Sequence, residues 1–370
     1  MEFWTGIRAD PVTIAGRAVE IEQGGWDGLL VPDSQSLVAD TYVLLAVAAG
    51  ATSTLKIGTG VTNPYTRNAA ITASAIASVQ AVSGGRAVLG VGRGDSSLAH
   101  LGYAPASPAY FERFLARVQA YLRGERVAFE PAAEEGIRPV DDLHLAGSPE
   151  ESRLRWLDPM LPKVPVDVAA SGPKVIRTAA LTAERLTFAL GADPERLSWA
   201  VDTARTARAE AGLDPDDLSF GCYIPFVTHP DAGVARSLNA VGVATLSRFL
   251  VMHGRPTALV DDESKAELER LAAGYDMKDH GAGAAKHRNV LSQGFADAFG
   301  IAGTPDQCIE RVKELEGLGL DRIKVIPALS EEPADLDDVV LSRTTMQNEV
   351  IPGLRGQPSP VRARGHAPSA

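Results

Sequence analysis

The sequence is poor in cysteine and in aromatic residues, and it has no long apolar run. Its 370 residues include 2 cysteines and 6% aromatic residues. Cys222 and Cys308 are too few for a disulfide framework, and both lie in apolar segments typical of buried thiols in a reducing compartment. No run of about 18 apolar residues is present, and the first residues lack the basic and apolar regions of a secretion signal. We therefore expect a cytoplasmic protein with no membrane partner.

The chain also lacks an excess of basic residues. It has 36 Lys and Arg against 47 Asp and Glu, a net charge of −11. A nucleic-acid partner is not expected, because binding to phosphates needs clustered cations. The hydrophobic content of 45% and the charged content of 22% are those of a globular protein and exclude a disordered or collagen-like chain. A small-molecule partner is the remaining expectation.

Short apolar runs alternate with helical patterns along most of the chain. The runs are nearly continuous in apolar residues, as in parallel strands that are buried on both faces. Eight of them are predicted as strands, at 3–8, 26–31, 55–59, 86–91, 164–170, 186–190, 218–227 and 321–327. Helical patterns follow most of these strands, and one begins with Thr304 and Gln307 in the spacing of a capping box. Eight strand and helix units predict a (β/α)8 TIM barrel as a single domain over residues 1–352.

Three segments depart from this repeat. Residues 124–163 are rich in Pro, Glu, Asp and Gly, and residues 232–300 are helical in character. Both are expected as insertions at the C-terminal face of the barrel, where long loops form lids or substrate walls. Residues 353–370 are rich in Pro, Gly and Arg and are predicted to form a disordered tail.

Glycines gather at the carboxyl end of the fourth predicted strand. Residues 90–95 read Gly-Val-Gly-Arg-Gly-Asp. The spacing differs from the dinucleotide-binding G-x-G-x-x-G fingerprint, so a Rossmann site is not predicted. A tight turn alone would explain the glycines, but their place at a strand's carboxyl end favours a ligand-binding loop.

Two further strand ends carry turn and polar residues. Residues 169–175 read Ala-Ala-Ser-Gly-Pro-Lys-Val, in which Ser171 is suited to cap a helix and Lys174 adds a positive charge. This predicts either an anion site at the helix start or an ordinary capped helix. Asp33 ends the second strand, where its carboxylate can either accept a hydrogen bond from a ligand or cap a loop.

Several common catalytic signatures are missing. The seven histidines show no spacing typical of a metal site, and we find no nucleophile elbow, P-loop or redox cysteine pair. No metal is therefore expected. A barrel with glycine and anion loops but no evident nucleophile favours an enzyme whose cofactor carries the reaction.

Taken together, these loops resemble those of the bacterial luciferase-like superfamily, in its methylenetetrahydromethanopterin reductase-like branch. The resemblance rests on residues 58–67, 83–95, 169–174 and 301–311, which occur in the family's order. It implies a barrel that binds FMN or the deazaflavin coenzyme F420 at its C-terminal mouth. It also implies a non-prolyl cis peptide at Gly60–Val61, behind the cofactor ring. The cofactor-binding residues that it implies are Asp33, Gly60, Val61, Thr62, Gly92, Arg93, Gly94, Asp95, Ala170, Ser171, Gly172, Pro173 and Lys174.

The chain departs from the resemblance at the second strand. Many deazaflavin enzymes have a histidine after the acidic residue, whereas this chain has Ser34. The proton donor is therefore unassigned, with Asp33 as the only catalytic candidate. On the substrate side, Trp4, Arg8, Tyr65 and Arg67 are candidates, although core packing or a surface ion pair would equally explain them.

The resemblance leaves several functions open. The first is an F420-dependent oxidoreductase that transfers a hydride between the cofactor and a small organic substrate. The second is an FMN-dependent monooxygenase that uses O2 and a separate flavin reductase. A flavin-binding protein without turnover and a barrel enzyme without flavin are minor alternatives. A homodimer is expected from the resemblance, through the helices after the second and third strands, where many Ala and Ser at 66–83 could pack closely across a two-fold axis. The same pattern would equally suit a helix that lies on the barrel.

Overall fold

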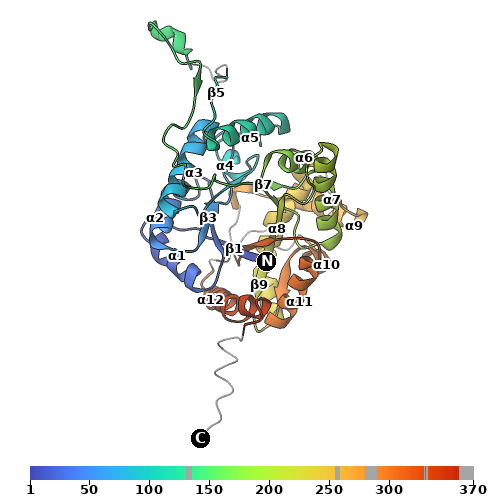
Figure 1. Ribbon diagram of the computed structural model, residues 1–370. Coiled ribbons are helices and arrows are strands. Elements are labelled where there is room, and N and C mark those ends of the chain that lie inside the picture. Colours follow the sequence, from blue (N-terminus) through green and yellow to red (C-terminus); the bar gives the residue numbers. More distant parts are fainter. Residues whose placement is uncertain (131–135, 255–258, 280–289, 329, 331, 358–370) are drawn as a thin grey trace.

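Eight parallel strands close into a barrel in the computed structural model, which describes residues 1–130, 136–254, 259–279, 290–328, 330 and 332–357 (Figure 1). Each strand pairs with the next around the barrel, and the last one pairs with the first. In order they are β1 (Glu2–Gly6), β2 (Gly28–Val31), β3 (Lys56–Thr59), β4 (Ala87–Val91), β7 (Val166–Ala170), β8 (Arg185–Phe188), β9 (Ser219–Thr228) and β11 (Arg322–Ile326). The predicted (β/α)8 barrel is confirmed, because all eight strands fall within the predicted runs or within a residue of them.

Helices surround the barrel. They are α1 (Ile14–Gln23), α2 (Thr41–Ala51), α3 (Ala69–Ser83), α4 (Ser96–Ala99), α5 (Pro108–Leu122), α6 (Pro173–Thr182), α7 (Pro194–Glu210), α11 (Pro305–Glu316) and α12 (Leu336–Thr345). Side chains cap the starts of several of them, among them α2, α3, α5 and α7. The predicted capping box of α11 is present, with Thr304 N donating to Gln307 Oε1 at 2.9 Å. Helix α5 was not predicted from the sequence, and its first turn is capped by the Ser107 side chain.

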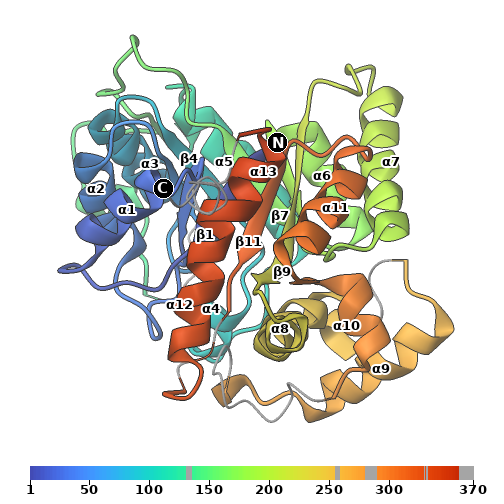
Figure 2. The same cartoon turned by 90° about the horizontal axis from the view of Figure 1, so that it is seen from below.

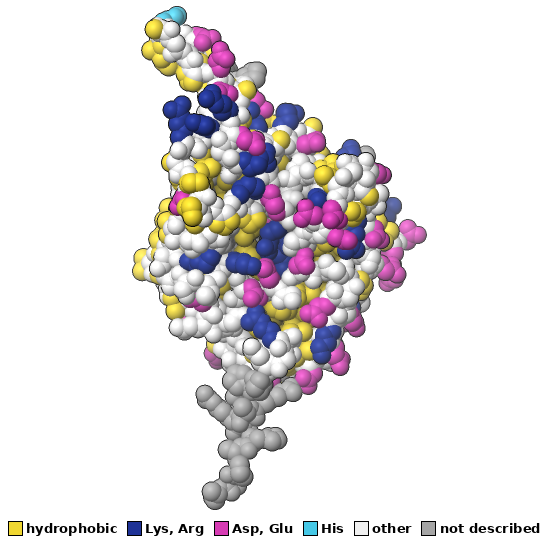
Figure 3. All heavy atoms as spheres, viewed as in Figure 1, with side chains coloured by type: hydrophobic (Ala, Val, Ile, Leu, Met, Phe, Trp, Pro, Cys, Tyr) yellow, Lys and Arg dark blue, Asp and Glu magenta, His cyan; other side chains and the backbone are white. Residues whose placement is uncertain are grey.

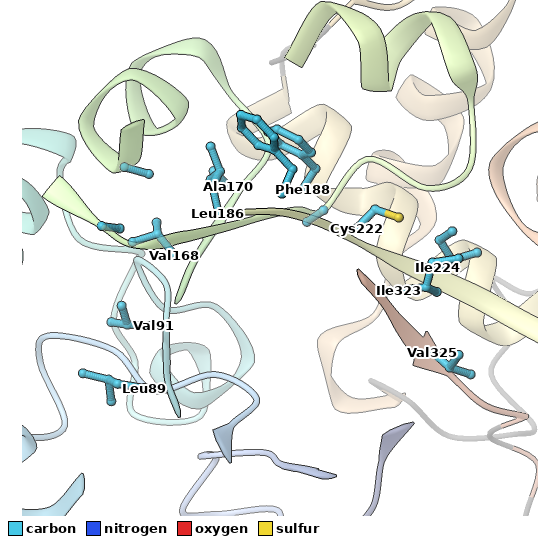
Figure 4. Packing of buried hydrophobic residues seen from close by; sticks show 14 of the residues in the cluster. Leu89, Val91, Val168, Ala170, Leu186, Phe188, Cys222, Ile224, Ile323 and Val325 are labelled. Atoms are coloured by element: carbon cyan, nitrogen blue, oxygen red, sulfur yellow. The ribbon is translucent and has the colours of Figure 1, made fainter. Parts of the chain in front are cut away.

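The core lies between the outer side of the strands and the helices. Alternate side chains of each strand point outward into it, because successive residues of a strand face opposite sides. Figure 4 shows such residues from neighbouring strands, among them Leu89, Val168, Leu186 and Cys222. The other side chains fill the barrel interior. Both free cysteines are buried.

Residues 124–163 do not lie where we expected them. They follow helix α5 rather than a strand, and they contain the short antiparallel pair of β5 (Val127–Ala128) and β6 (Glu151–Ser152), in an arm that projects from the barrel (Figure 1). Gln80, at the end of α3, donates to the carbonyl of Pro162 at 2.8 Å, just before β7. A connection from a helix into a strand lies at the strand's amino end, so this segment does not form a wall of the C-terminal mouth.

Residues 232–300 do follow a strand and lie at the opposite end. They form α8 (Ala232–Ser247), the 3-10 segment η2 (Arg248–Gly254), α9 (Asp262–Gly274), η3 (Met277–Asp279) and α10 (Gln293–Phe299), followed by the strand β10 (Ile301–Gly303), which pairs with β9 outside the barrel. Figure 2 shows α8, α9 and α10 at the same end of the molecule as α4, away from the N-terminus. Residues 280–289 of this segment lie outside the described residues.

The chain ends with α12, a π-helical turn at Met346–Val350 and α13 (Ile351–Leu354). The predicted tail therefore starts later than residue 353, because Gly353 and Leu354 belong to a helix, and residues 358–370 lie outside the described part. Within the described residues, no helix combines the length and apolarity needed to cross a bilayer. On the face seen in Figure 3, acidic and basic side chains are interspersed over the barrel.

Candidate active site

A cavity of about 580 Å³ opens at the carboxyl ends of the strands. Its volume is within the usual range for a small-molecule site. Every barrel strand, or the residue just after it, contributes one position to its wall or floor. These positions are Gly6, Leu30, Gly60, Gly92, Ala169, Ala189, Tyr223 and Ile326. Most of them are small or apolar, which gives a slot that suits a flat ring.

The peptide between Gly60 and Val61 is cis, as the resemblance implies, and both residues line the cavity. Hydrogen bonds hold this segment on both sides. Gly60 N donates to Val31 O at 2.8 Å, and Thr62 N donates to Gly90 O at 3.0 Å. The segment after β3 is therefore fixed to the ends of β2 and β4 and presents a rigid edge to the cavity.

The glycines after β4 are needed for close packing rather than for flexibility alone. A side chain at Gly90 would bring its Cβ within 2.0 Å of the carbonyl oxygen of Thr59. A Cβ at Gly92 would lie 3.2 Å from Val61 Cγ2. Gly94 has a φ of +90°, which L side chains rarely adopt. This loop thus approaches the Gly60–Val61 segment as only glycine allows.

The loop after β4 also contacts the long insertion. Asp95 forms an ion pair with Arg248, the first residue of η2, and Asp95 lines the cavity. The Arg248 guanidinium lies over the rings of Phe249 and Tyr275, 5.2 and 4.9 Å from their centroids. Burial lowers the pKa of Arg248 from its ordinary value. The pair therefore joins the loop after β4 to the long insertion at η2.

The start of α6 faces the cavity with residues 170–175. The N-cap is Gly172, and no side chain caps the helix, so the prediction that Ser171 is the cap is wrong. The first amide groups of a helix carry partial positive charge and favour an anion. Ser171 and Lys174 also line the wall here. The arrangement fits a phosphate group.

Asp33 lies in the cavity wall but is held by protein groups. Its side chain is 3% exposed, and it accepts a hydrogen bond from Thr62 Oγ1 at 2.7 Å. Arg67 Nη1 lies 2.9 and 2.7 Å from its two carboxylate oxygens. Burial acts to lower the pKa of Arg67, but the carboxylates of Asp33 and Asp40 outweigh it and raise that pKa. Asp33 therefore fastens the end of β2 to the segment after β3.

The structure brings together nearly all of the predicted cofactor-side residues. Only Thr62 is absent from the cavity wall, because it is fully buried behind Asp33. Of the substrate-side candidates, one lines the cavity and the others do not. Arg8 lines the cavity, whereas Trp4 is fully buried below it in the barrel interior. Tyr65 stacks on a neighbouring tyrosine and does not line the cavity.

Arg67, the fourth of these candidates, is committed to Asp33 and is likewise absent from the wall. Three candidates for direct contact with a ligand are therefore withdrawn, namely Trp4, Tyr65 and Arg67. Three residues that line the cavity were not predicted from the sequence, namely Tyr223, Thr245 and Phe249. The alternation of side chains along β9 would have placed Tyr223 in the barrel interior, but nothing in the sequence marked Thr245 or Phe249.

Comparison with known proteins agrees with the geometry. The profile of the luciferase-like monooxygenase family matches residues 5–322. A 5,10-methylenetetrahydromethanopterin reductase of Methanolobus tindarius is 31% identical over 325 residues, which cover 86% of this chain and 91% of that protein. A phthiodiolone/phenolphthiodiolone dimycocerosates ketoreductase of Mycobacterium tuberculosis is 28% identical over 88% of this chain and 83% of the relative.

Two solved structures share the fold. The F420-dependent tetrahydromethanopterin reductase of Methanopyrus kandleri superposes with a TM-score of 0.67 at 22% identity, over 95% of this chain and 99% of that chain. An F420-dependent secondary alcohol dehydrogenase gives the same TM-score at 18% identity, over 96% and 100% of the two chains. The reductases that are about 30% identical in sequence place the chain among the oxidoreductases. By the match over residues 5–322 and by its closed barrel, the chain belongs to the luciferase-like monooxygenase family.

Proposed function

We propose that this protein binds coenzyme F420 in the cavity at the barrel mouth and transfers a hydride between it and a small organic substrate. One observation carries the proposal. An apolar slot between the Gly60–Val61 segment and the opposite strands is continuous with an uncapped helix start at Gly172. A cofactor with a flat ring and a phosphate needs both of these features in one cavity.

The residues present fit such a group. Gly60, Val61 and Gly92 would lie against the ring, and Arg93, Gly94 and Asp95 would line its edge and the chain that leads from it. Ala170, Ser171, Gly172, Pro173 and Lys174 would hold the phosphate. When it is bound, the deazaflavin supplies or accepts the hydride. The protein aligns the substrate carbon with the reacting carbon of the ring and excludes water.

The names of relatives support F420 over FMN. The reductase of Methanopyrus kandleri and the secondary alcohol dehydrogenase are both named as F420-dependent, and both are similar in fold. The fold is also shared with a monooxygenase of Streptomyces bottropensis, at a TM-score of 0.63 and 16% identity. An FMN-dependent monooxygenase, served by a separate flavin reductase, is therefore the alternative that the experiment must separate.

The test is a paired titration of the purified protein with F420 and with FMN, followed by fluorescence. We expect micromolar or tighter binding of F420 and at least tenfold weaker binding of FMN. Tight binding of FMN alone would replace our proposal with the monooxygenase. Binding of neither would overturn the cofactor site. Binding of F420 with no hydride transfer to any substrate tried would favour the alternative of a flavin-binding protein that catalyses no reaction.

A matched pair of lysine variants locates the cofactor. Lys174→Ala removes a positive charge from the cavity wall at the start of α6. We expect its Kd for F420 to rise by about tenfold, the effect of losing one charge-assisted contact. Lys313→Ala removes an exposed lysine from α11, outside the cavity, and should leave the Kd unchanged.

We also propose that the protein forms a homodimer in the cytoplasm. The outward faces of α2 and α3 expose Val43, Val47, Ile71 and Val82 by 51, 37, 54 and 55%. Exposed apolar side chains on neighbouring helices are typical of a surface that a second copy covers. Analytical ultracentrifugation should give twice the mass of the chain. Ile71→Glu should shift the protein to the monomer, and a wild-type monomer would contradict the proposal.

A further inference from the structure

The barrel interior below the cavity contains a buried group of charged side chains. Asp167 of β7 is fully buried and lies 3.0 Å from Lys324 Nζ and 3.2 Å from Arg322 Nη2. Arg185 of β8 approaches the same carboxylate at 3.5 Å and also pairs with Glu2. Burial acts to raise the pKa of Asp167, but the three cations outweigh it and hold that pKa well below its usual value. Three cations thus surround one carboxylate directly under the site.

Tyr223 connects this charged group to the cavity. It lines the cavity floor, and its hydroxyl lies 3.4 Å from Lys324 Nζ. A charged lysine can only donate, so the tyrosine oxygen accepts this hydrogen bond. The hydroxyl proton of Tyr223 is then left for another acceptor, and no hydrogen bond from it to a described residue is present. Its position in the floor makes a ligand in the cavity the available acceptor.

The position of Tyr223 suits the far side of a bound ring. Strand β9 lies four places from β3 in the barrel order, so Tyr223 lies across the cavity from Gly60 and Val61. A ring that rests against the Gly60–Val61 segment would turn its free face toward Tyr223. The other floor positions are apolar or glycine, among them Leu30, Ala169 and Ala189. Tyr223 is thus the polar side chain of the described floor that faces the space left for a substrate.

We propose that Tyr223 is the proton donor of the reaction, and that Lys324 is the residue that positions its hydroxyl. The proposal rests on the proposed hydride transfer and adds a substrate class, a carbonyl or imine compound. It also assigns a role to Tyr223 that Asp33 is unsuited to fill, because both oxygens of Asp33 already accept hydrogen bonds from Arg67.

Reduction of the substrate requires one hydride and one proton. When bound, the reduced deazaflavin would supply the hydride for the new C–H bond at the substrate carbon, while the C=O or C=N π bond breaks. The Tyr223 hydroxyl proton passes to the substrate oxygen or nitrogen and forms the new O–H or N–H bond. The phenolate that remains takes a proton from the Lys324 ammonium. The lysine regains a proton from water after the product leaves.

The pH dependence follows from Lys324 and the groups around it. Burial lowers the pKa of Lys324 to about 8, although Asp167 acts in the opposite direction. The titratable or charged groups that face it are Asp167 on β7, Arg185 on β8, Tyr223 on β9 and Arg322 on its own strand, with Glu2 on β1 behind Arg185. Reduction of the substrate should therefore slow as the pH rises through about 8, because the neutral lysine no longer stabilises the negative charge that develops on the Tyr223 oxygen.

The experiment uses the full chain loaded with reduced F420, and its probes are a ketone, acetone, and a cyclic imine, 1-pyrroline. Single-turnover oxidation of the cofactor is followed between pH 6 and 10 in H2O and in D2O. We expect Tyr223→Phe to slow the reaction by at least a hundredfold and to abolish the solvent isotope effect, while its Kd for F420 changes by less than threefold. Lys324→Arg keeps a positive charge, so it should remove the decline in rate above pH 8.

A second readout does not depend on activity. In protein labelled with ¹³C at the lysine ε-carbon, the resonance of Lys324 is assigned by its loss in Lys324→Arg. Its titration midpoint should lie near pH 8 and should move to lower pH in Tyr223→Phe, because the charged lysine loses its acceptor. Tyr121→Phe is the matched control, since Tyr121 is also buried and bonds Ser152 at 2.8 Å on the outside of the barrel. It should change neither the midpoint nor the rate.

The outcomes separate this proposal from the proposed function. Failure to bind F420 overturns the cofactor site and this proposal together. Binding of F420 without reduction of either probe overturns the proton donor and its substrate class, while the cofactor site stands. A Tyr223→Phe variant that reacts within threefold of wild type, or that keeps the solvent isotope effect, overturns the assignment of Tyr223. An unmoved Lys324 midpoint in that variant overturns the role of Lys324.

Discussion

The guanidinium of Arg67 contacts both carboxylate oxygens of Asp33, at 2.9 and 2.7 Å, in the wall of the cavity. The two residues are 34 positions apart in the sequence and come from the segments that follow the neighbouring strands β2 and β3. The contact explains why an arginine that resembles a ligand for an anionic substrate does not line the cavity. It acts on the site by fixing the shape of the wall.

Loss of this ion pair should destabilise the protein. Arg67→Ala leaves the Asp33 carboxylate buried with only Thr62 as a hydrogen-bond partner. Removing one partner of a buried pair costs about 3 kcal/mol in the free energy of unfolding. Urea unfolding measures this loss. Arg126→Ala breaks an ion pair with Glu151 in which Arg126 is 68% exposed, and it should cost less than about 1 kcal/mol. Equal losses in the two variants would contradict our account of Asp33.

Three glycine variants separate backbone packing from ligand contact. Gly90→Ala should give little folded protein, because its Cβ would meet the fixed carbonyl oxygen of Thr59 at 2.0 Å. Gly92→Ala should fold, since the nearest atom is a side-chain methyl of Val61 at 3.2 Å, but it should weaken F420 binding by narrowing the slot. Gly16→Ala has open space around its Cβ within α1 and should raise the stability by about 0.5–1 kcal/mol. Thermal unfolding measures the stability of each variant, and fluorescence titration measures its affinity for F420. A normally folded Gly90→Ala variant would refute the packing argument.

The ion pair between Asp95 and Arg248 should control how firmly the long insertion is held. Asp95→Asn removes the carboxylate that Arg248 contacts, so the amides of residues 248–251 should exchange hydrogen faster. The same variant should weaken F420 binding, because Asp95 lines the cavity. Asp297→Asn is the control, since its pair with Arg236 lies in the same insertion but is about half exposed. Unchanged exchange in Asp95→Asn would show that other contacts hold the segment.

Acid should weaken the fold through Glu2. Burial acts to raise the pKa of Glu2, but Lys56, Trp4 and Arg185 outweigh it and lower that pKa to about 2, from an ordinary 4.5. The folded state therefore binds the proton more weakly than the unfolded state. The stabilisation is complete above about pH 4.5 and is lost as the pH falls toward 2.

Glu2→Gln should lower the free energy of unfolding by about 1–2 kcal/mol at pH 7, after allowance for the partial exposure of the side chain. The difference from wild type should shrink between pH 4.5 and 2. Urea unfolding at a series of pH values measures it. Glu316→Gln, at an exposed position of α11, should unfold like wild type at each pH. A difference for Glu2→Gln that stays constant down to pH 2 would contradict the pKa argument.

The cofactor side of the site was largely predictable because each loop carries its own local signal. Glycines at 90, 92 and 94 mark a close approach of the backbone, and Pro173 with Lys174 marks a helix start. The position of the cap was wrong by one residue, because Ser171 and Gly172 are both compatible with a cap and only the backbone path selects one. The cis peptide at Gly60–Val61 came from the family resemblance and not from any local rule.

The substrate side was not predictable in the same way. Trp4, Tyr65 and Arg67 carry the chemistry of ligand contacts, but each has a protein partner or a buried position that no local pattern reveals. The place of residues 124–163 was misjudged because α5 was not recognised, so the segment was assigned to the wrong end of the barrel.

The sequence by itself determined a parallel sheet covered by helices, because nearly continuous apolar runs that alternate with helical patterns bury both faces of such a sheet. The number of eight such runs favoured its closure into a barrel. The sequence also marked a loop where the backbone approaches a neighbouring strand closely, because only glycine leaves room for the Thr59 carbonyl oxygen at Gly90. Only the tertiary structure decided which polar side chains face the cavity. Tyr223, Lys324 and Asp167 come from three different strands, and the closure of the barrel is what brings them together beneath the site.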